Sequence, residues 1–213
     1  MHHSYEFVSE QEYKPVKERL EQLIQEVQDY LRKDHYPILY KYVGSAERDM
    51  ITRDPTTNVG YDFDLNIYFE NRYCYLSSPQ TIKAKIMNAF NKHVEKYGYN
   101  FCEDSTRVIT IKTINHTNST IIHSADFCII KDLPNGQIQI IKNNKQTNSY
   151  YWETLSQYPI ELSERAAALK NRGYWNKVKE LYLRKKNRND DPNVKSRSIY
   201  SMTINQLYHT YCS

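Results

Sequence analysis

Two aspartates separated by one apolar residue are the first candidates for chemistry in this sequence. Asp62 and Asp64 lie within 61–69, where apolar residues alternate with more polar ones, a pattern typical of a β-strand. Side chains two apart on a strand point to the same side, so the two carboxylates project together while Phe63 and Leu65 face the opposite layer. Like charges held close together raise the free energy unless a cation lies between them, and carboxylate oxygens suit a hard divalent ion. The spacing therefore predicts a Mg²⁺ site.

A third acidic residue interrupts an otherwise apolar segment. Asp126 is the only charged residue in 124–130, which is predicted to be a strand. An unpaired carboxylate buried in such a strand is costly, so we expect Asp126 to have a partner such as a metal ion.

A glycine and a serine precede the aspartates. Gly44 and Ser45 follow a short β-like run over 38–43 and precede a predicted helical turn at 46–48. Glycine lets the backbone approach a ligand closely, and the free N–H groups of a helical turn together with the serine hydroxyl suit a phosphate. Combined with the carboxylates, this pair predicts a site for a nucleoside triphosphate.

Helices and strands that could position these residues are expected along the first two thirds of the chain. Apolar residues at intervals of three and four predict helices over 16–33, with Pro15 early in the helix, and over 79–97. The turn Pro134-Asn135-Gly136 should join two antiparallel strands. Strands are expected at 38–43, 61–69, 107–114, 120–131 and 137–141.

The sequence changes character after residue 142. A polar loop is expected over 143–148, and Tyr150-Tyr151-Trp152 is interpreted as a packing layer between two lobes. Beyond Pro159 the pattern becomes helical. We expect one helix starting at Ser163 and others over 174–186 and 199–208.

The bulk composition is that of an ordinary globular protein. Of 213 residues, 39% are hydrophobic and 25% are charged, and no apolar run approaches the ~18 residues of a membrane span. The segment 1–6 has no basic region followed by a hydrophobic stretch, and the four cysteines form no Cys-x-x-Cys pair. We therefore expect a cytoplasmic protein with reduced thiols and no membrane partner.

Basic charge is concentrated near the C-terminus. Residues 163–197 carry 11 Lys or Arg against 4 Asp or Glu, a balance of +7, and the other residues carry −3. The first interpretation of such a surface is a solvated face, and the second is a surface that binds polyphosphate or nucleic acid. A nucleotide is favoured over a long nucleic acid, because the remaining acidic surface would repel a long polyanion.

At Gly44-Ser45, Asp62-Phe63-Asp64 and Asp126, the sequence resembles the nucleotidyltransferase superfamily of DNA polymerase β and poly(A) polymerase. It is most similar to the branch of oligoadenylate synthetase and cyclic GMP-AMP synthase, with its bacterial relatives, over residues 38–131. The resemblance implies an α+β nucleotidyltransferase fold, in which a mixed twisted sheet is backed by helices and followed by a C-terminal helical lobe. We expect the catalytic domain over 1–150 and the lobe over 151–213.

The resemblance also implies two-metal nucleotidyl transfer. Asp62, Asp64 and Asp126 would hold two Mg²⁺ ions, with Mn²⁺ as a substitute. A nucleoside monophosphate would pass from a triphosphate to a hydroxyl acceptor with release of pyrophosphate, and Asp126 would help to deprotonate that hydroxyl. Nucleotide second messengers are one class of product.

The same resemblance assigns further residues to nucleotide binding. Gly44 and Ser45 would contact the phosphates, and the helical lobe would supply a cation. Lys177 and Lys179 are the candidates, together with Ser196.

Two other functions remain open at this stage. One is an adenylyltransferase that modifies a small molecule or a protein, which would share the site and differ only in its acceptor. The other is a non-catalytic module that binds nucleotide or RNA. Three clustered carboxylates weigh against a module that only binds, since they repel phosphate.

Overall fold

The computed structural model describes residues 4–155 and 160–212. Residues 1–3 and Pro159, which entered the sequence predictions, lie outside the described residues. The chain divides into two compact units. The larger unit comprises 8–51 and 58–157, and the smaller one comprises 1–7, 52–57 and 158–213. The division into domains at residues 150 and 151 stays a prediction.

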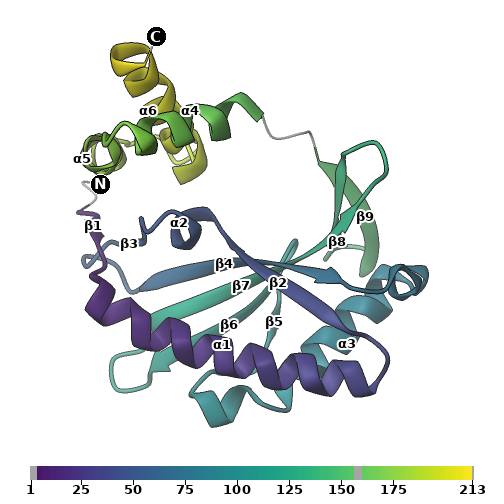
Figure 1. Cartoon of the computed structure of the whole chain (residues 1–213). Coiled ribbons are helices and arrows are strands. Elements are labelled where there is room, and N and C mark those ends of the chain that lie inside the picture. The colour runs from purple at the N-terminus through teal and green to yellow at the C-terminus, as the bar shows by residue number, and fades with distance from the viewer. Residues whose placement is uncertain (1–3, 156–159, 213) are drawn as a thin grey trace. The chain divides into compact units, whose positions relative to one another are not determined.

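A seven-stranded mixed sheet forms the centre of the larger unit (Figure 1). Five strands lie in the order β2-β4-β7-β6-β5, β8 pairs with the far part of β7, and β9 pairs with β8. The pairing of β4 with β7 is parallel, and the other pairings are antiparallel. The strands are β2 (Ile38–Val43), β4 (Tyr61–Phe69), β5 (Glu103–Asp104), β6 (Ile109–Asn115), β7 (Thr120–Asp132), β8 (Ile138–Asn144) and β9 (Ser149–Leu155).

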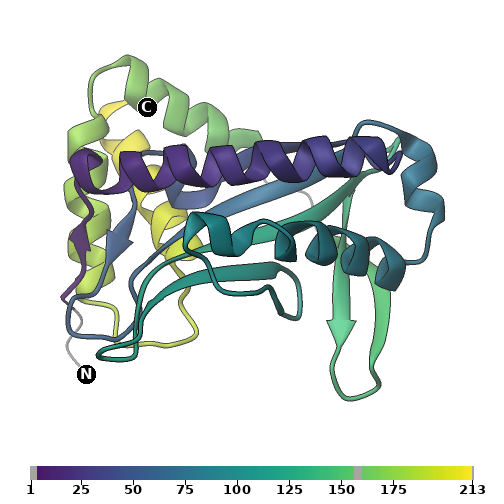
Figure 2. The ribbon, with the colours of Figure 1, turned by 90° about the horizontal axis from the view of Figure 1, so that it is seen from below.

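Helices α1 (Glu10–Lys33) and α3 (Pro79–Asn91) cover one face of this sheet, as Figures 1 and 2 show. Apolar residues on this side of the strands meet the helices, and the rings of Phe90 and Phe127 lie 4.4 Å apart between centroids. Burial of these surfaces supplies the main driving force for the unit. The short helices α2 (Gly44–Glu47), η1 (Arg72–Leu76) and η2 (Val94–Tyr97) complete it. The α+β class with a mixed sheet is confirmed.

The first helix begins earlier than the sequence predicted. It starts at Glu10, so Pro15 lies inside the helix and not near its first turn. Tyr13 extends the buried stripe of α1 toward the N-terminus. This additional burial offsets the backbone hydrogen bond that a proline inside a helix removes.

The polar loop expected over 143–148 is wrong in part. Strand β8 continues to Asn144, and β9 returns antiparallel to it, with Ile141 opposite Trp152. Lys142 Nζ lies 2.7 Å from Glu153 Oε1, which adds an ion pair across the two strands. Favourable cross-strand pairs therefore outweigh the low strand preference of asparagine and lysine.

The smaller unit is mainly helical. Its helices are α4 (Ile160–Asn171), α5 (Trp175–Asn187) and α6 (Ser196–Tyr211), so the three expected helices are confirmed, although the first begins at Ile160 and not at Ser163. Strands β1 (Glu6–Phe7) and β3 (Thr52–Arg53) form a two-stranded sheet, and Lys186 Nζ donates to Thr52 Oγ1 at 2.6 Å. No helix among the described residues is both long and apolar enough to cross a membrane.

Candidate functional site

The candidate site lies on the face of β4 and β7 that is turned away from α1 and α3. On β4, Phe63 and Leu65 are buried, whereas Asp62 is exposed and Asp64 is partly exposed on the opposite face. This alternation agrees with the strand pattern in the sequence. On β7, Asp126 likewise lies between buried neighbours.

The parallel pairing places two of the carboxylates side by side. Asp64 is the direct partner of Asp126 in the register of β4 and β7. Asp62 lies two residues before Asp64 on the same face, opposite Ser124. The structure therefore brings residues from positions 62, 64 and 126 to one small area of the sheet.

The environment of Asp64 disfavours its ionised form. Burial, followed by the charges of Asp62 and Asp126, raises its pKa to about 7, against the opposing effect of Arg48. The pKa of Asp126 is also raised, mainly by burial, although a hydrogen bond from Thr110 opposes this. A cation bound between these carboxylates would offset both the burial and the like-charge repulsion that raise the two pKa values.

The turn at Gly44 contacts this acidic area directly. Val43, the last residue of β2, pairs with Asp64, and Gly44 follows with a φ of +67°. A Cβ atom added to Gly44 would lie 2.5 Å from Asp64 Oδ2. Only glycine therefore fits this close approach without a shift of the backbone or the carboxylate. Ser45 follows at once, so the predicted phosphate turn and the predicted metal ligands converge.

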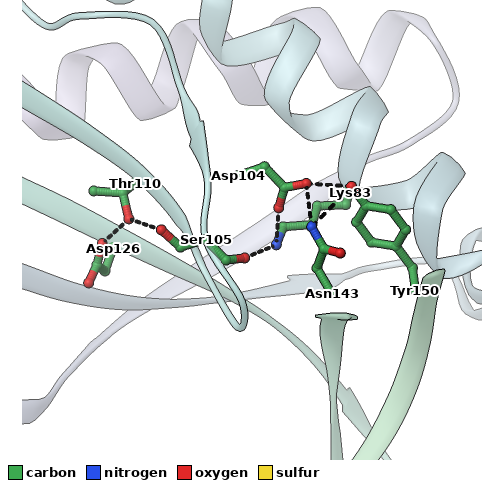
Figure 3. Close-up of polar contacts among 7 residues, drawn as sticks. All are labelled: Lys83, Asp104, Ser105, Thr110, Asp126, Asn143 and Tyr150. Carbon is green, nitrogen blue, oxygen red and sulfur yellow. Dashed lines mark hydrogen bonds and ion pairs between the residues drawn. The ribbon is translucent and has the colours of Figure 1, made fainter. Parts of the chain in front are cut away.

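Two residues of β6 also belong to this face, and the sequence reasoning missed them. Thr110 pairs with Asp126, and its Oγ1 donates to Asp126 Oδ1 at 2.5 Å (Figure 3). Lys112 pairs with Ser124 and forms an ion pair with Glu103 at 2.6 Å. Both lie at alternate positions of the predicted strand 107–114, which is the signal that could have identified them once the register was known.

The donor set fits a hard divalent ion. Mg²⁺ is commonly held by one or two carboxylates together with waters and substrate phosphates, and not by a cage of protein atoms alone. Among residues 4–155 and 160–212, no group of three or more His, Cys, Asp or Glu side chains forms such a cage. Asp62 and Asp64, with the Gly44 turn packed against Asp64, match the arrangement in which phosphate oxygens supply the other ligands.

The candidates in the helical unit do not lie together. Lys177 Nζ lies 5.3 Å from the ring centroid of Tyr211, whereas Lys179 Nζ lies 6.0 Å from that of Phe7. Ser196 is the first residue of α6 and lines a small cavity with Tyr5. A role for these residues in nucleotide binding stays a prediction.

Comparison with solved structures identifies the fold. One similar structure is that of DncV of Vibrio cholerae, a cyclic AMP-GMP synthase described as a prokaryotic cGAS homolog, in complex with the linear intermediate pppA(3′,5′)pG. The TM-score is 0.57 at 14% identity, and the match covers 93% of this chain and 54% of that one. DncV of Escherichia coli bound to 3′-deoxy GTP matches with a TM-score of 0.54 at 15% identity, covering 93% and 53%. CdnG of Bradyrhizobium diazoefficiens, a CD-NTase in complex with GTP, matches with a TM-score of 0.50 at 14% identity, covering 80% and 49%.

These matches show the fold, and the chain spans about half the length of the structures it matches. No protein-family model matches the sequence, and no curated protein sequence matches it. The chain has the nucleotidyltransferase fold of the bacterial cGAS-like enzymes, which confirms at the level of fold the resemblance seen in the sequence.

Proposed function

We propose that this protein is a Mg²⁺-dependent nucleotidyltransferase that makes a nucleotide second messenger. The observation that carries the proposal is the side-by-side placement of Asp64 and Asp126, with Gly44 packed against Asp64. The fold supports it, because the similar structures include a cyclic AMP-GMP synthase with a linear dinucleotide intermediate and others with GTP bound. We place this activity in the cytoplasm, where nucleoside triphosphates are available.

The proposed reaction joins an acceptor hydroxyl to the α-phosphate of a nucleoside triphosphate. The hydroxyl oxygen forms a new bond to the α-phosphorus, the bond between this phosphorus and the bridging oxygen breaks, and pyrophosphate leaves. Two Mg²⁺ ions supply stabilisation of the attacking and leaving oxygens in this kind of displacement. Asp62 and Asp64 would hold them, with Asp126 sharing one.

Asp126 has the additional role of taking the proton from the acceptor hydroxyl. Thr110 donates to Asp126 Oδ1, and we assign the proton to the other oxygen, Oδ2. Burial, together with the charge of Asp62, raises the pKa of Asp126, so Asp126 would accept a proton more readily than an isolated aspartate.

The phosphates are assigned to the turn after β2. Gly44 lets the backbone pack directly against Asp64, and the Ser45 hydroxyl would donate to a phosphate oxygen. We also propose that the helical unit supplies positive charge to the triphosphate from Lys177 or Lys179, with Ser196 as a further contact.

The test is product analysis. The full chain is incubated with Mg²⁺ and each of ATP, GTP, CTP and UTP, alone and in pairs, and pyrophosphate and products are identified by mass. We expect a product containing at least two nucleotides, and Asp64→Asn should abolish it. Asp132→Asn, at an exposed position at the end of the same strand as Asp126, is the matched control and should retain activity.

Three results would redirect the proposal. A nucleotide attached to a protein or a small molecule would favour an adenylyltransferase. Binding of nucleotide without release of pyrophosphate would favour a non-catalytic module. Release of pyrophosphate by Asp64→Asn at the rate of Asp132→Asn and the wild type would place the site elsewhere.

A further inference from the structure

A buried lysine holds the turn next to the candidate site. Lys83 on α3 is only 2% exposed, and its Nζ lies 2.6 Å from Asp104 Oδ1 and donates to the carbonyl oxygen of Ser105 at 2.6 Å (Figure 3). A buried charge is tolerated only when it is paired and hydrogen-bonded. The pair of Lys83 and Asp104, called here the buried brace, therefore fixes the place where β5 ends.

Strands β8 and β9 complete the contacts of the brace. Asp104 Oδ2 accepts hydrogen bonds from Tyr150 Oη and from Asn143 Nδ2, the latter at 3.0 Å. The backbone N–H of Asn143 donates to the carbonyl oxygen of Thr106 at 2.8 Å. The turn between β5 and β6 is thus held from α3 on one side and from the β8–β9 hairpin on the other.

Hydroxyl groups connect this turn to Asp126. Thr110 Oγ1 donates to Asp126 Oδ1 at 2.5 Å, and Ser105 Oγ lies 3.3 Å from Thr110 Oγ1. A hydroxyl has one proton, and Thr110 uses its proton on the carboxylate. Ser105 is therefore the donor in the second contact, so the chain of donation runs from Ser105 through Thr110 to Asp126.

We propose that Lys83 and Asp104 act as positioning residues for Asp126, through Ser105 and Thr110. The inference rests on the proposed function, in which Asp126 contacts a metal ion and the acceptor hydroxyl. Because Thr110 holds Oδ1, the carboxylate of Asp126 cannot rotate freely, and the orientation of Oδ2 is fixed. Groups that orient a metal ligand in this way commonly contribute about 10- to 100-fold to metal affinity or activity.

The hydroxyl is tested by a pair of variants at residue 110. Thr110→Val keeps the shape and removes the donor, whereas Thr110→Ser keeps the donor. We expect Thr110→Val to lower kcat about 10- to 100-fold with little change in KM for the nucleotide, and Thr110→Ser to stay close to the wild type. Mn²⁺ binding in the presence of a non-hydrolysable triphosphate, measured by electron paramagnetic resonance, should weaken in Thr110→Val and recover in Thr110→Ser.

The brace is tested by removing both of its charges together. Either single change leaves a buried charge unpaired and is expected to destabilise the fold, whereas the double variant Lys83→Met/Asp104→Asn avoids this. We expect the double variant to lower kcat about tenfold. Combined with Thr110→Val, it should lower kcat little further, because both changes act through the same carboxylate. The control is Lys85→Met. Lys85 lies on the same helix and pairs with Asp34, so this change should leave kcat unchanged.

The outcomes separate the two proposals. No pyrophosphate release by the wild type refutes the proposed function, and with it the positioning role. An active wild type with unchanged kcat and Mn²⁺ binding in Thr110→Val refutes the positioning role alone. Effects of Thr110→Val and the double variant that multiply would show that the brace acts independently of Thr110, which refutes the route from the brace to Asp126.

Discussion

Replacing Asp64 by asparagine should stabilise the metal-free protein while abolishing its activity. The pKa of Asp64 is raised from 3.8 to about 7, first by burial and then by Asp62 and Asp126. Because the folded state binds this proton more tightly than the unfolded chain does, the free energy of unfolding falls as the pH rises from about 4 to about 7. The asparagine side chain of the variant carries no charge, so the variant avoids this loss.

The size of the effect follows from the shift. About three pKa units at ~1.36 kcal/mol per unit set an upper limit of ~4 kcal/mol above pH 7. Asp64 is partly exposed, and water at the carboxylate reduces this value, so we expect about 2 kcal/mol at pH 8. For a chain of this length, that gain corresponds to a rise in Tm of roughly 4–8 °C.

The assay is thermal unfolding in EDTA at pH 5 and at pH 8. The advantage of Asp64→Asn over the wild type should be larger at pH 8, because the wild type has lost only part of its stability at pH 5. Asp132→Asn, which changes an exposed carboxylate, is the control and should track the wild type at both values. A variant that gains nothing at pH 8, or the same amount at both values, would refute the assignment of Asp64 to a repulsive cluster. Adding Mg²⁺ with a non-hydrolysable triphosphate should then raise the Tm of the wild type more than that of Asp64→Asn.

Three further perturbations test other parts of the structure. Gly44→Val places a Cβ 2.5 Å from Asp64 Oδ2 at a φ of +67°, so calorimetry should detect no nucleotide binding. Ser45→Ala should weaken nucleotide binding by about 1–2 kcal/mol. Equal and negligible effects of the two changes would remove the turn from the site. Burial lowers the pKa of His123 to about 4, so the folded state loses stability as the pH falls from about 6.5 to 4. His123→Phe should remove part of this loss, up to about 3 kcal/mol. Identical acid unfolding of the variant and the wild type would contradict this prediction. The affinity of the full chain for nucleotide should decrease only modestly with salt, and it should be lower in Lys177→Ala or Lys179→Ala. Tight binding of random-sequence RNA, with an affinity that falls about a thousandfold between about 50 and 200 mM salt, would instead indicate a nucleic-acid surface.

The alternation along β4 shows what the sequence could predict. Tyr61 to Phe69 alternates so regularly that strand, buried face and the common direction of Asp62 and Asp64 all follow from period two. The helical stripe of α1 and the tight turn after β7 are equally local signals. The fold class could be stated because these local signals agree with one another.

Register and long-range pairing could not be obtained in the same way. The pairing of Thr110 with Asp126 depends on how β6 aligns with β7, which includes a shift between Thr113 and Ile114. The burial of Lys83 depends on Asp104, Asn143 and Tyr150, which are distant in sequence, so the residue resembles an ordinary exposed lysine of an amphipathic helix. Strand β9 was missed although Tyr150, Tyr151, Trp152 and Thr154 favour strands, because these aromatic residues were interpreted as a packing layer and the pairing with β8 is not visible in the sequence.

The position of bound metal tests the assignment of Asp62 and Asp64 as metal ligands most directly. Crystals of the full chain grown with Mn²⁺ and a non-hydrolysable triphosphate would locate the ion by its anomalous scattering. We expect Mn²⁺ about 2 Å from carboxylate oxygens of Asp62 and Asp64, with phosphate oxygens completing the coordination beside Gly44 and Ser45. Metal bound at other residues, or the same metal peaks in Asp64→Asn, would contradict it.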